Sequence, residues 1–549
     1  QKEKDFNSAI DSFKRAIKLQ PNYSEAYSNL GQAMYQNSQF EEAITSYKEA
    51  LKIDPKNMMA YMNLAISYDE KDEFDLAIAC YKKALEINPL SSEIYTNLGN
   101  SFLKQEKIDD SIACYKKSIN INPSNSKTHN NLGTAYKKKG LADEAVSEYK
   151  QAVKLNPYNL YANFNLGVFM DESDDFTSAI NAYKVCINLN PKYVDAYTNL
   201  AIVYQEVGSI KLAIDTYKQA LHIDPHNIKS RWNLALAQLL SGDYQNGLKN
   251  YEWRFKNKNS CKLHSSPSSE SVVNNIIKTK ENILVITEQG LGDTIQYMRY
   301  IPYLRNKGIK VCFSAQQKLH NLIKSSSIDD NPLTPEEANI INDRRWIPLL
   351  SLPKQLGVTP NNPIISDPYI KPKKELLIKW KNLLSYEKNP VVGINWQGSL
   401  DMEKKSYKGR SIPLEIFSIL LKNNNITFLS LQKGYGSEQL KYCSFKNRFV
   451  SCQQEIDQIW DFSENAAIAA NCNLIISCDT SVAHLAGGMG KKVWLLLKDI
   501  PFWTWGLHGN TSFWYPSMRL FRQERKYDWA GLMEEVAIEL KKELTNFYD

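Results

Sequence analysis

Glu288–Tyr297 combines glycines with one acidic residue directly after a short apolar run, a pattern that could act on a bound ligand. The run Gly290-Leu291-Gly292-Asp293 would let the backbone turn tightly and approach a ligand at the carboxyl end of a strand. Asp293 would lie at the start of the following helix and could remove a proton from a substrate. An aspartate at that position also caps a helix. Taken alone, this segment favours capping.

A second segment, Asn471–Gly487, places Asp479-Thr480-Ser481 between an apolar run and a helix rich in small residues. The free N–H groups and the dipole of a helix N-terminus suit a diphosphate, and Thr480 and Ser481 would add hydroxyl donors. His484 falls within the predicted helix. There, packing and ligand contact are equally compatible with the sequence.

A third segment, Asn395–Ser399, is followed by a basic stretch that contains Lys408 and Arg410. Cations in a loop directly after a strand could clamp phosphate groups. An exposed basic loop without a ligand would have the same composition, so both interpretations stay open.

These segments are expected to sit on parallel strands. Short apolar runs, several of them rich in Val and Ile, alternate with helical segments over about 270 residues, which predicts two doubly wound α/β halves. The two halves should join near residues 370–390, where Pro368, Pro372 and Pro390 cluster. The predicted strands are 283–287, 310–314, 391–395, 427–431, 474–477 and 493–497.

The first half of the chain repeats every 34 residues. Asparagine recurs in register, each time followed by Leu and then by Gly or Ala, and a proline keeps the same spacing. This period is the tetratricopeptide signature, in which each repeat forms two antiparallel helices. The second helices, with Ala and Tyr at fixed positions, are expected to be structural. The asparagines are Asn29, Asn63, Asn97, Asn131, Asn165, Asn199 and Asn233.

These seven amides are predicted to point away from the repeat core and to line the concave side of a superhelix. Asn29 lies roughly 150° around its helix from the apolar stripe that contains Tyr27 and Leu30. A primary amide both donates and accepts, so a ladder of amides could hold a peptide backbone. Recent duplication of a harmless exposed residue is the alternative. The pattern resembles the superhelix of O-linked N-acetylglucosamine transferase, which implies binding of an extended acceptor peptide.

From about residue 281 onward the chain resembles the glycosyltransferase domain of bacterial tetratricopeptide-repeat proteins, related to family 9, the heptosyltransferases. The resemblance rests on Gly290–Asp293, Ser351–Pro353, Arg410–Leu414, Leu431–Gly434, Asp479–Gly487 and Phe513–Arg522. It implies a GT-B fold, that is, two Rossmann-like halves with the active site in the cleft. Residues 499–506 depart from the heptosyltransferase pattern, so a heptose donor is not implied.

The same resemblance implies the roles of individual residues. Asp293 matches the catalytic base, Arg410 a phosphate-binding lysine, and Glu438 a ribose-binding acid. The predicted donor-binding residues are Gly290, Gly292, Trp396, Gln397, Gly398, Lys408, Arg410, Gln432, Lys433, Glu438, Asp479, Thr480, Ser481 and His484.

Composition limits the function classes. The net charge of +7 is spread over helix surfaces and does not form a stripe, which argues against a nucleic-acid partner. The sequence contains no run of about 20 apolar residues, so it predicts no membrane span. The nine cysteines lack paired metal spacing and suit a reducing cytoplasm. The chain opens within a repeat, so we expect the natural protein to extend upstream.

We therefore predict a tetratricopeptide solenoid over residues 1–255, a linker over 256–280, an acceptor-side half over 281–375 and a nucleotide-sugar half over 376–549. The expected activity is inverting, metal-independent transfer of a sugar from a nucleotide-sugar to a protein or peptide, without a cofactor. A scaffold with an inactive GT-B domain, or a transferase acting on a glycan, is the alternative. The sugar, the base and a homo-oligomeric state stay open.

Overall fold

The computed structural model describes residues 2–256, 263–273, 277–278, 280–400, 403, 409–422 and 424–548. Its contacts divide the chain into two compact units, residues 1–203 and residues 204–549.

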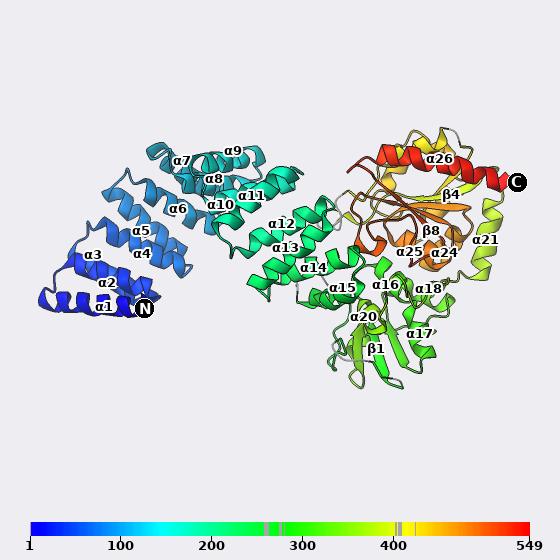
Figure 1. The fold of residues 1–549 in the computed structure, drawn as a ribbon, viewed down its shortest axis with the longest axis horizontal. Coiled ribbons are helices and arrows are strands. Elements are labelled where there is room, and N and C mark those ends of the chain that lie inside the picture. The colour runs from blue at the N-terminus through cyan, green and yellow to red at the C-terminus, as the bar shows by residue number, and fades with distance from the viewer. Residues whose placement is uncertain are drawn as a thin grey trace. The chain divides into compact units, whose positions relative to one another are not determined.

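The first unit consists of antiparallel helix pairs that follow one another in sequence order (Figure 1). Asparagines or serines at several helix starts accept a backbone hydrogen bond, as Asn57 does from the amide of Ala60 at 3.0 Å. The helices are α1 (Lys2–Leu19), α2 (Ser24–Gln36), α3 (Phe40–Ile53), α4 (Met58–Glu70), α5 (Phe74–Ile87), α6 (Ser92–Lys104), α7 (Ile108–Ile121), α8 (Ser126–Lys139), α9 (Ala142–Leu155), α10 (Leu160–Glu172), α11 (Phe176–Leu189) and α12 (Val194–Glu206), which crosses the unit boundary.

The helices of a pair interlock through one small residue, glycine or alanine, and one tyrosine. In the first complete repeat, Tyr47 is buried on α3, and a Cβ atom on Gly31 of α2 would lie 2.7 Å from its ring. The same buried tyrosine recurs at Tyr81, Tyr115, Tyr149, Tyr183 and Tyr217. The expectation that the second helices are structural is confirmed by this packing.

The second unit begins with further helical repeats and continues into an α/β region. α13 (Ile210–Ile223), α14 (Ile228–Leu240), α15 (Tyr244–Tyr251) and the 3₁₀ turn η1 (Glu252–Phe255) precede the first strand. A three-stranded parallel sheet has the order β2-β1-β3, with β1 (Asn282–Ile286), β2 (Lys310–Ser314) and β3 (Arg345–Pro348).

A five-stranded sheet, again entirely parallel, has the order β5-β4-β6-β7-β8. Its strands are β4 (Val391–Asn395), β5 (Thr427–Ser430), β6 (Leu474–Cys478), β7 (Val493–Leu497) and β8 (Met518–Arg522). All six strands predicted from the sequence are present, with limits that agree to within one residue. β3 and β8 were not predicted as strands.

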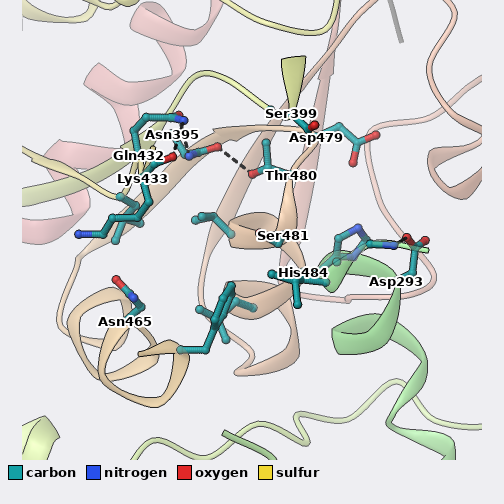
Figure 2. Close-up of a pocket in the computed structure, with 18 of the residues that line it drawn as sticks. Asp293, Asn395, Ser399, Gln432, Lys433, Asn465, Asp479, Thr480, Ser481 and His484 are labelled. Atoms are coloured by element: carbon teal, nitrogen blue, oxygen red, sulfur yellow. Dashed lines mark hydrogen bonds between the residues drawn. The ribbon is translucent and has the colours of Figure 1, made fainter. Parts of the chain in front are cut away.

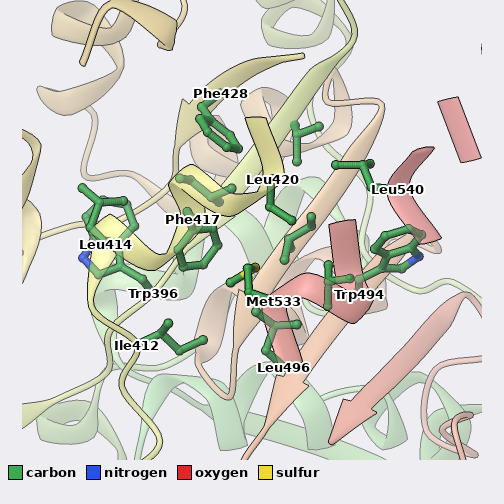
Figure 3. Packing of buried hydrophobic residues seen from close by; sticks show 14 of the residues in the cluster. Trp396, Ile412, Leu414, Phe417, Leu420, Phe428, Trp494, Leu496, Met533 and Leu540 are labelled. Carbon is green, nitrogen blue, oxygen red and sulfur yellow. The ribbon is translucent and has the colours of Figure 1, made fainter. Parts of the chain in front are cut away.

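Helices cover both faces of the five-stranded sheet. α26 (Trp529–Tyr548) lies on one face, and α24 (Phe462–Ala470) and α25 (Ser481–Gly488) lie on the other (Figure 1). Trp396, Phe417 and Met533 belong to the buried apolar cluster between the sheet and α26 (Figure 3). This packing fixes the strand ends that carry the polar residues considered below.

The remaining helices connect the strands. They are α16 (Leu291–Tyr297), α17 (Tyr300–Asn306), η2 (Gln317–Leu319), α18 (His320–Ser325), α19 (Pro335–Asn339), η3 (Leu349–Ser351), α20 (Leu352–Leu356), α21 (Lys374–Leu384), η4 (Leu414–Leu421), η5 (Ser437–Lys441), η6 (Lys446–Arg448), α23 (Gln453–Asp457) and η7 (Trp503–Trp505).

Two parallel sheets with helical crossovers agree with the predicted α/β class, and the predicted domain limits stay predictions. Within the described ranges, every helix is too short or too polar to cross a lipid bilayer.

Candidate functional site

A cavity of about 940 Å³ lies where the carboxyl ends of β1, β4, β5 and β6 meet. In parallel α/β sheets this edge is the usual place for a ligand. Segments that follow all four strands line it, and these segments include the three that the sequence singled out. The lining thus joins residues from both sheets in one site. Its glycine-rich part is Gln289–Asp293, and its helix-terminal part is Asp479–Val482.

A hydrogen-bonded network holds the strand ends in place. Asn395, the last residue of β4, donates to Oε1 of Gln432 at 2.9 Å and accepts from the hydroxyl of Thr480 at 2.7 Å (Figure 2). The backbone amide of Gln397 also donates to Gln432 Oε1, at 3.0 Å. Gln432 and Asn395 are both buried. Because each polar atom has a partner, the network fixes one geometry for the cavity wall.

The N-terminus of α25 opens on the cavity. Thr480 is the N-cap residue, and Ser481 and Val482 begin the helix. Backbone amides in the first turn of a helix lack partners within the helix, so they can bind an anion. The guanidinium of Arg410 donates to the backbone carbonyl of Asp479 at 3.3 Å. A positive side chain and a helix N-terminus therefore face the same space.

Asp293 lies on the opposite wall, in the first turn of α16. Its Oδ2 accepts the backbone amide of Gly290 at 3.0 Å, as the capping interpretation predicts. Burial raises the pKa of the Asp293 carboxyl from 3.8 to about 7, the Gly290 amide lowers it, and the Glu288 and Asp479 carboxylates raise it. The carboxyl thus caps the helix and also titrates near neutral pH, which suits a general base.

His484 sits between the two walls. Its Nδ1 lies 2.9 Å from the hydroxyl of Tyr515, and its ring stacks on Trp505 with centroids 5.2 Å apart. Burial, with a smaller effect of Arg299, lowers the pKa of His484 to about 3, so the ring is neutral. A Cβ atom on Gly292 would lie 3.1 Å from the His484 ring. The histidine therefore packs and also lines the cavity.

Gln296, one turn after Asp293, also lines the cavity and is 1% exposed. Its Nε2 is buried and has no hydrogen-bond partner among the described residues. A buried donor without a partner carries a free-energy cost that a bound acceptor atom would relieve.

Most of the predicted site residues of the α/β region converge on the cavity. Lys433 lines it, although its ammonium donates to the carbonyl of Ile456, and burial lowers the pKa of that ammonium. The predicted residues on the cavity wall are Gly290, Gly292, Asp293, Gln397, Gly398, Arg410, Gln432, Lys433, Asp479, Thr480, Ser481 and His484.

The structure places two predicted residues elsewhere. Trp396 is fully buried, and its indole donates to the carbonyl of Gly436 at 3.2 Å, so we assign it to the core. Glu438 is exposed outside the lining and accepts the amide of Gly436 at 2.8 Å. Lys408 lies outside the described residues.

The lining also contains residues that the sequence did not single out as ligand contacts. Asn395 and Gln296 were noted only as parts of motifs, and Asn465 and Trp460 were not singled out. No local pattern marks them, because each depends on which strand ends are neighbours. The side-chain environment of Asn395 follows only from the pairing of β4 with β5 and β6.

In the first unit, Asn29 is exposed and Asn63, Asn97, Asn131, Asn165 and Asn199 are half-buried, as is Asn233 in the second unit. Asn131 donates to Oδ1 of Asn100 at 2.8 Å, and Asn165 donates to Oδ1 of Asn130 at 2.9 Å. The amides thus leave the repeat cores, while two of them bond to the neighbouring repeat. Peptide binding by these amides stays a prediction.

A buried ion pair joins the last helical turn to the cavity segment within the second unit. Arg254 on η1 donates to both carboxylate oxygens of Glu288, at 2.9 and 2.8 Å, and to the hydroxyl of Ser351 at 2.7 Å. Arg254 and Glu288 are both 0% exposed. Beside them, Gln289 donates to the hydroxyl of Tyr251 at 3.3 Å. The end of the helical repeats therefore positions the backbone that leads to Asp293.

Within the described ranges, no group of three His, Cys, Asp or Glu side chains is arranged to hold a metal ion.

Comparison with known proteins identifies the helical repeats. Family models described as TPR repeat or tetratricopeptide repeat match residues 2–38, 35–72, 59–89, 80–113, 99–140, 126–159 and 194–227. These residues form tetratricopeptide repeats, as the 34-residue period predicted.

A curated relative and several solved structures resemble parts of the chain. Protein FlbA of Caulobacter vibrioides is 27% identical over 176 residues, which are 32% of this chain and 29% of FlbA. The APC/C hetero-tetramer Cut9-Hcn1 matches with 20% identity and a TM-score of 0.38, over 42% of this chain and 46% of that chain. MamA matches with 31% identity and a TM-score of 0.27, over 28% of this chain and 90% of that chain.

Proposed function

We propose that the protein is a glycosyltransferase that moves a sugar from a nucleotide-sugar to a protein or peptide bound by the helical repeats. The observation that carries the proposal is the facing pair of features in the cavity. A carboxyl group that titrates near neutral pH lies on one wall, and a cation beside a helix N-terminus lies on the other. Displacement of a nucleoside diphosphate by a hydroxyl group needs both features. A GT-B architecture is part of the same proposal.

The donor would bind through its diphosphate at the start of α25. Backbone amides at Ser481 and Val482 and the hydroxyl of Ser481 provide hydrogen-bond donors, and the guanidinium of Arg410 provides a positive charge. The leaving diphosphate gains negative charge as the glycosidic bond breaks. Fixed donors that face this charge lower the barrier without rearranging during the reaction.

Asp293 would act as the general base. The acceptor hydroxyl oxygen forms a bond to the anomeric carbon while the bond from that carbon to the diphosphate oxygen breaks. The hydroxyl proton passes to the Asp293 carboxylate, and the nucleoside diphosphate leaves. Attack opposite the leaving group inverts the configuration of the anomeric carbon. With a pKa of about 7, Asp293 is ionised in a large fraction of molecules at neutral pH and can still hold the proton it receives.

The acceptor would be held by the amides that leave the repeat cores, since each offers a donor and an acceptor to a peptide backbone. Arg410 and the α25 terminus can offset the leaving-group charge, so the mechanism requires no metal. We place the reaction in the cytoplasm, in line with the free thiols of the eight described cysteines.

A panel of nucleotide-sugars tests the donor site. We expect one nucleotide-sugar to stabilise the folded protein by about 2.7 kcal/mol when present at 100 times its Kd. Arg410→Ala should abolish this shift in a thermal-unfolding titration. Asp293→Asn should keep the shift and slow sugar transfer or donor hydrolysis by about 10²- to 10⁴-fold, the usual contribution of a general base. Equal turnover by wild type and Asp293→Asn would contradict the proposed base.

A scaffold protein is the second candidate. It is favoured by the repeat matches, which all fall within residues 2–227, and repeats of this kind provide extended binding surfaces. A scaffold would bind its partners equally well with Asp293→Asn and would turn over no donor, whether or not its α/β region binds a nucleotide. Turnover, compared between wild type and Asp293→Asn, therefore separates the two candidates.

A further inference from the structure

Two aromatic side chains remain exposed at one end of the cavity. Trp460 is 64% exposed and Tyr435 is 49% exposed, and both line the cavity. They come from two different loops, one after β5 and one before α24. Burying large rings stabilises a protein, so two exposed rings on a cavity wall indicate a surface that a ligand covers.

This aromatic end is separated from Asp293 by the start of α25. Figure 2 shows Lys433 and Asn465 on one side, Thr480 and Ser481 in the middle, and Asp293 on the other side. Tyr435 lies two residues after Lys433. Trp460 lies beside Gly434, from which a Cβ atom would be 3.8 Å from its ring. The order along the cavity is therefore aromatic rings, helix N-terminus, carboxyl group.

Hydrogen bonds hold the loops that carry both rings. Nε2 of Gln432 donates to the carbonyl of Tyr435 at 2.8 Å and to that of Gln397 at 3.0 Å. Nδ2 of Asn465 donates to the carbonyl of Asp461 at 2.8 Å and to that of Ile459 at 3.4 Å. Because both donors of the Asn465 amide are used, its Oδ1 is the atom that can serve a ligand as an acceptor.

We propose that Trp460 and Tyr435 form a subsite that stacks on a nucleobase, with Asn465 Oδ1 accepting a hydrogen bond from a base N–H. A nucleotide-sugar has this order of groups: a planar base, a diphosphate and a sugar. Base and diphosphate would fit the aromatic rings and the α25 terminus, which leaves the sugar next to Asp293. Stacking on an aromatic side chain tolerates every base, because each base has a π face. The subsite rests on the proposed function, since the donor there is a nucleotide.

Nucleoside monophosphates and inorganic pyrophosphate separate the two parts of the site. In the full chain, Trp460→Ala should weaken binding of the monophosphate that binds wild type most tightly by at least about fivefold, the lower range for one base–aromatic stack. It should leave the Kd of pyrophosphate unchanged within about twofold. Trp460→Phe should recover most of the loss, because it restores a ring. Tyr442→Ala, at an 85% exposed tyrosine outside the lining, is the matched control and should change neither affinity.

Isothermal titration calorimetry gives the dissociation constants. An equal loss for pyrophosphate and monophosphate, no loss with Trp460→Ala, or no monophosphate binding by wild type would each overturn the subsite. Turnover of a nucleotide-sugar donor tests the transferase activity separately. Trp460-dependent binding in a protein that turns over no donor would keep the subsite and reject the transferase. Turnover that does not depend on Trp460 would keep the transferase and reject the subsite.

Discussion

The helical repeats and the α/β region bring their polar groups together over very different distances along the chain. In the repeats, Tyr47 packs on Gly31, and Asn131 bonds to Asn100 in the preceding repeat. At the α/β region, Arg254 donates to the hydroxyl of Ser351, 97 residues away, and Arg299 donates to the carbonyl of Trp514 at 2.7 Å, 215 residues away. A surface made from repeats can tolerate the loss of one contact. A cavity made from distant segments depends on each of the contacts that hold those segments.

The largest expected effect of breaking this arrangement is at the buried ion pair. Arg254→Ala removes the guanidinium that neutralises the buried carboxylate of Glu288 and should destabilise the second unit by about 3–5 kcal/mol. All eleven tryptophans lie at or beyond residue 232, so tryptophan fluorescence in a urea titration reports this unit.

The matched control lies in the repeats. Lys83 pairs with Glu86 at 2.8 Å, and both side chains are more than half exposed. Lys83→Ala should change stability by no more than about 0.5 kcal/mol, as is usual for exposed pairs. Equal effects of the two substitutions would remove the contrast between the regions.

A pH titration tests the burial of Asp293 independently of activity. Its pKa is about 7 in the folded protein and 3.8 in the reference state, so the folded state holds the proton more tightly. The stability from this proton is fully present below pH 4 and is lost as the pH rises to about 7. The free energy of unfolding of Asp293→Asn, taken relative to that of wild type, should therefore rise by about 4 kcal/mol between pH 4 and pH 8.

Urea titrations of both proteins across this pH range measure the difference, and groups that titrate alike in both cancel. A difference that does not change with pH would show that Asp293 is well solvated. The α25 wall would then face an ordinary surface carboxylate.

Substitutions at two glycines compare the packing of the two regions, with smaller expected losses of stability. A Cβ atom on Gly487 of α25 would lie 2.7 Å from the Tyr515 ring, and one on Gly31 would lie 2.7 Å from the Tyr47 ring. Alanine already occupies the equivalent repeat positions Ala65 and Ala201, so the repeat geometry accommodates a methyl group.

Gly487→Ala should therefore cost about 1–3 kcal/mol through overpacking. Gly31→Ala should cost less than about 1 kcal/mol, because alanine also favours the helix. Thermal unfolding followed by circular dichroism measures both, and a larger loss at Gly31 would show that the repeats are the more tightly constrained region.

The same contrast explains how far the sequence alone leads. The 34-residue period predicts the repeats because each contact lies within one or two periods. Six strands are predicted by short apolar runs, several of them rich in Val and Ile, whereas Arg345-Trp346-Ile347-Pro348 lacks such a run and was missed as β3. Gly290–Asp293 and Thr480 carry local signals. The link from Asn395 to Gln432 requires knowing that β4 and β5 are neighbours.

Trp396 shows how a motif can mislead. It lies between two residues of the cavity wall, Asn395 and Gln397, and the sequence predicted donor contact for it. Successive side chains at the end of a strand point to opposite faces of the sheet. The indole therefore enters the core beneath the wall, where Gly436 accepts its N–H. The alternation could have been read from the sequence, but the choice of face depends on the packing of η4 and α26.

The smallest expected effects are those on the asparagines, and here the structure separates two kinds of amide. Asn131 is bonded to Asn100 and accepts from Nδ2 of Asn130 at 3.2 Å, so Asn131→Ala should lower stability by about 1 kcal/mol. Asn29 is exposed and Asn63 is half-buried, so replacing both with alanine should leave stability within about 0.5 kcal/mol.

The same double variant tests whether the ladder holds a peptide backbone. Peptides selected from a random-sequence library on the wild-type protein should still bind the variant, but about fivefold or more weakly, since each hydrogen bond contributes about 0.5–1.5 kcal/mol. Asn22→Ala, an exposed amide in the turn before α2, is the control and should bind as wild type does. Unchanged affinity of the double variant would mean that the register of these amides reflects duplication, and acceptor recognition would then have to come from the cavity alone.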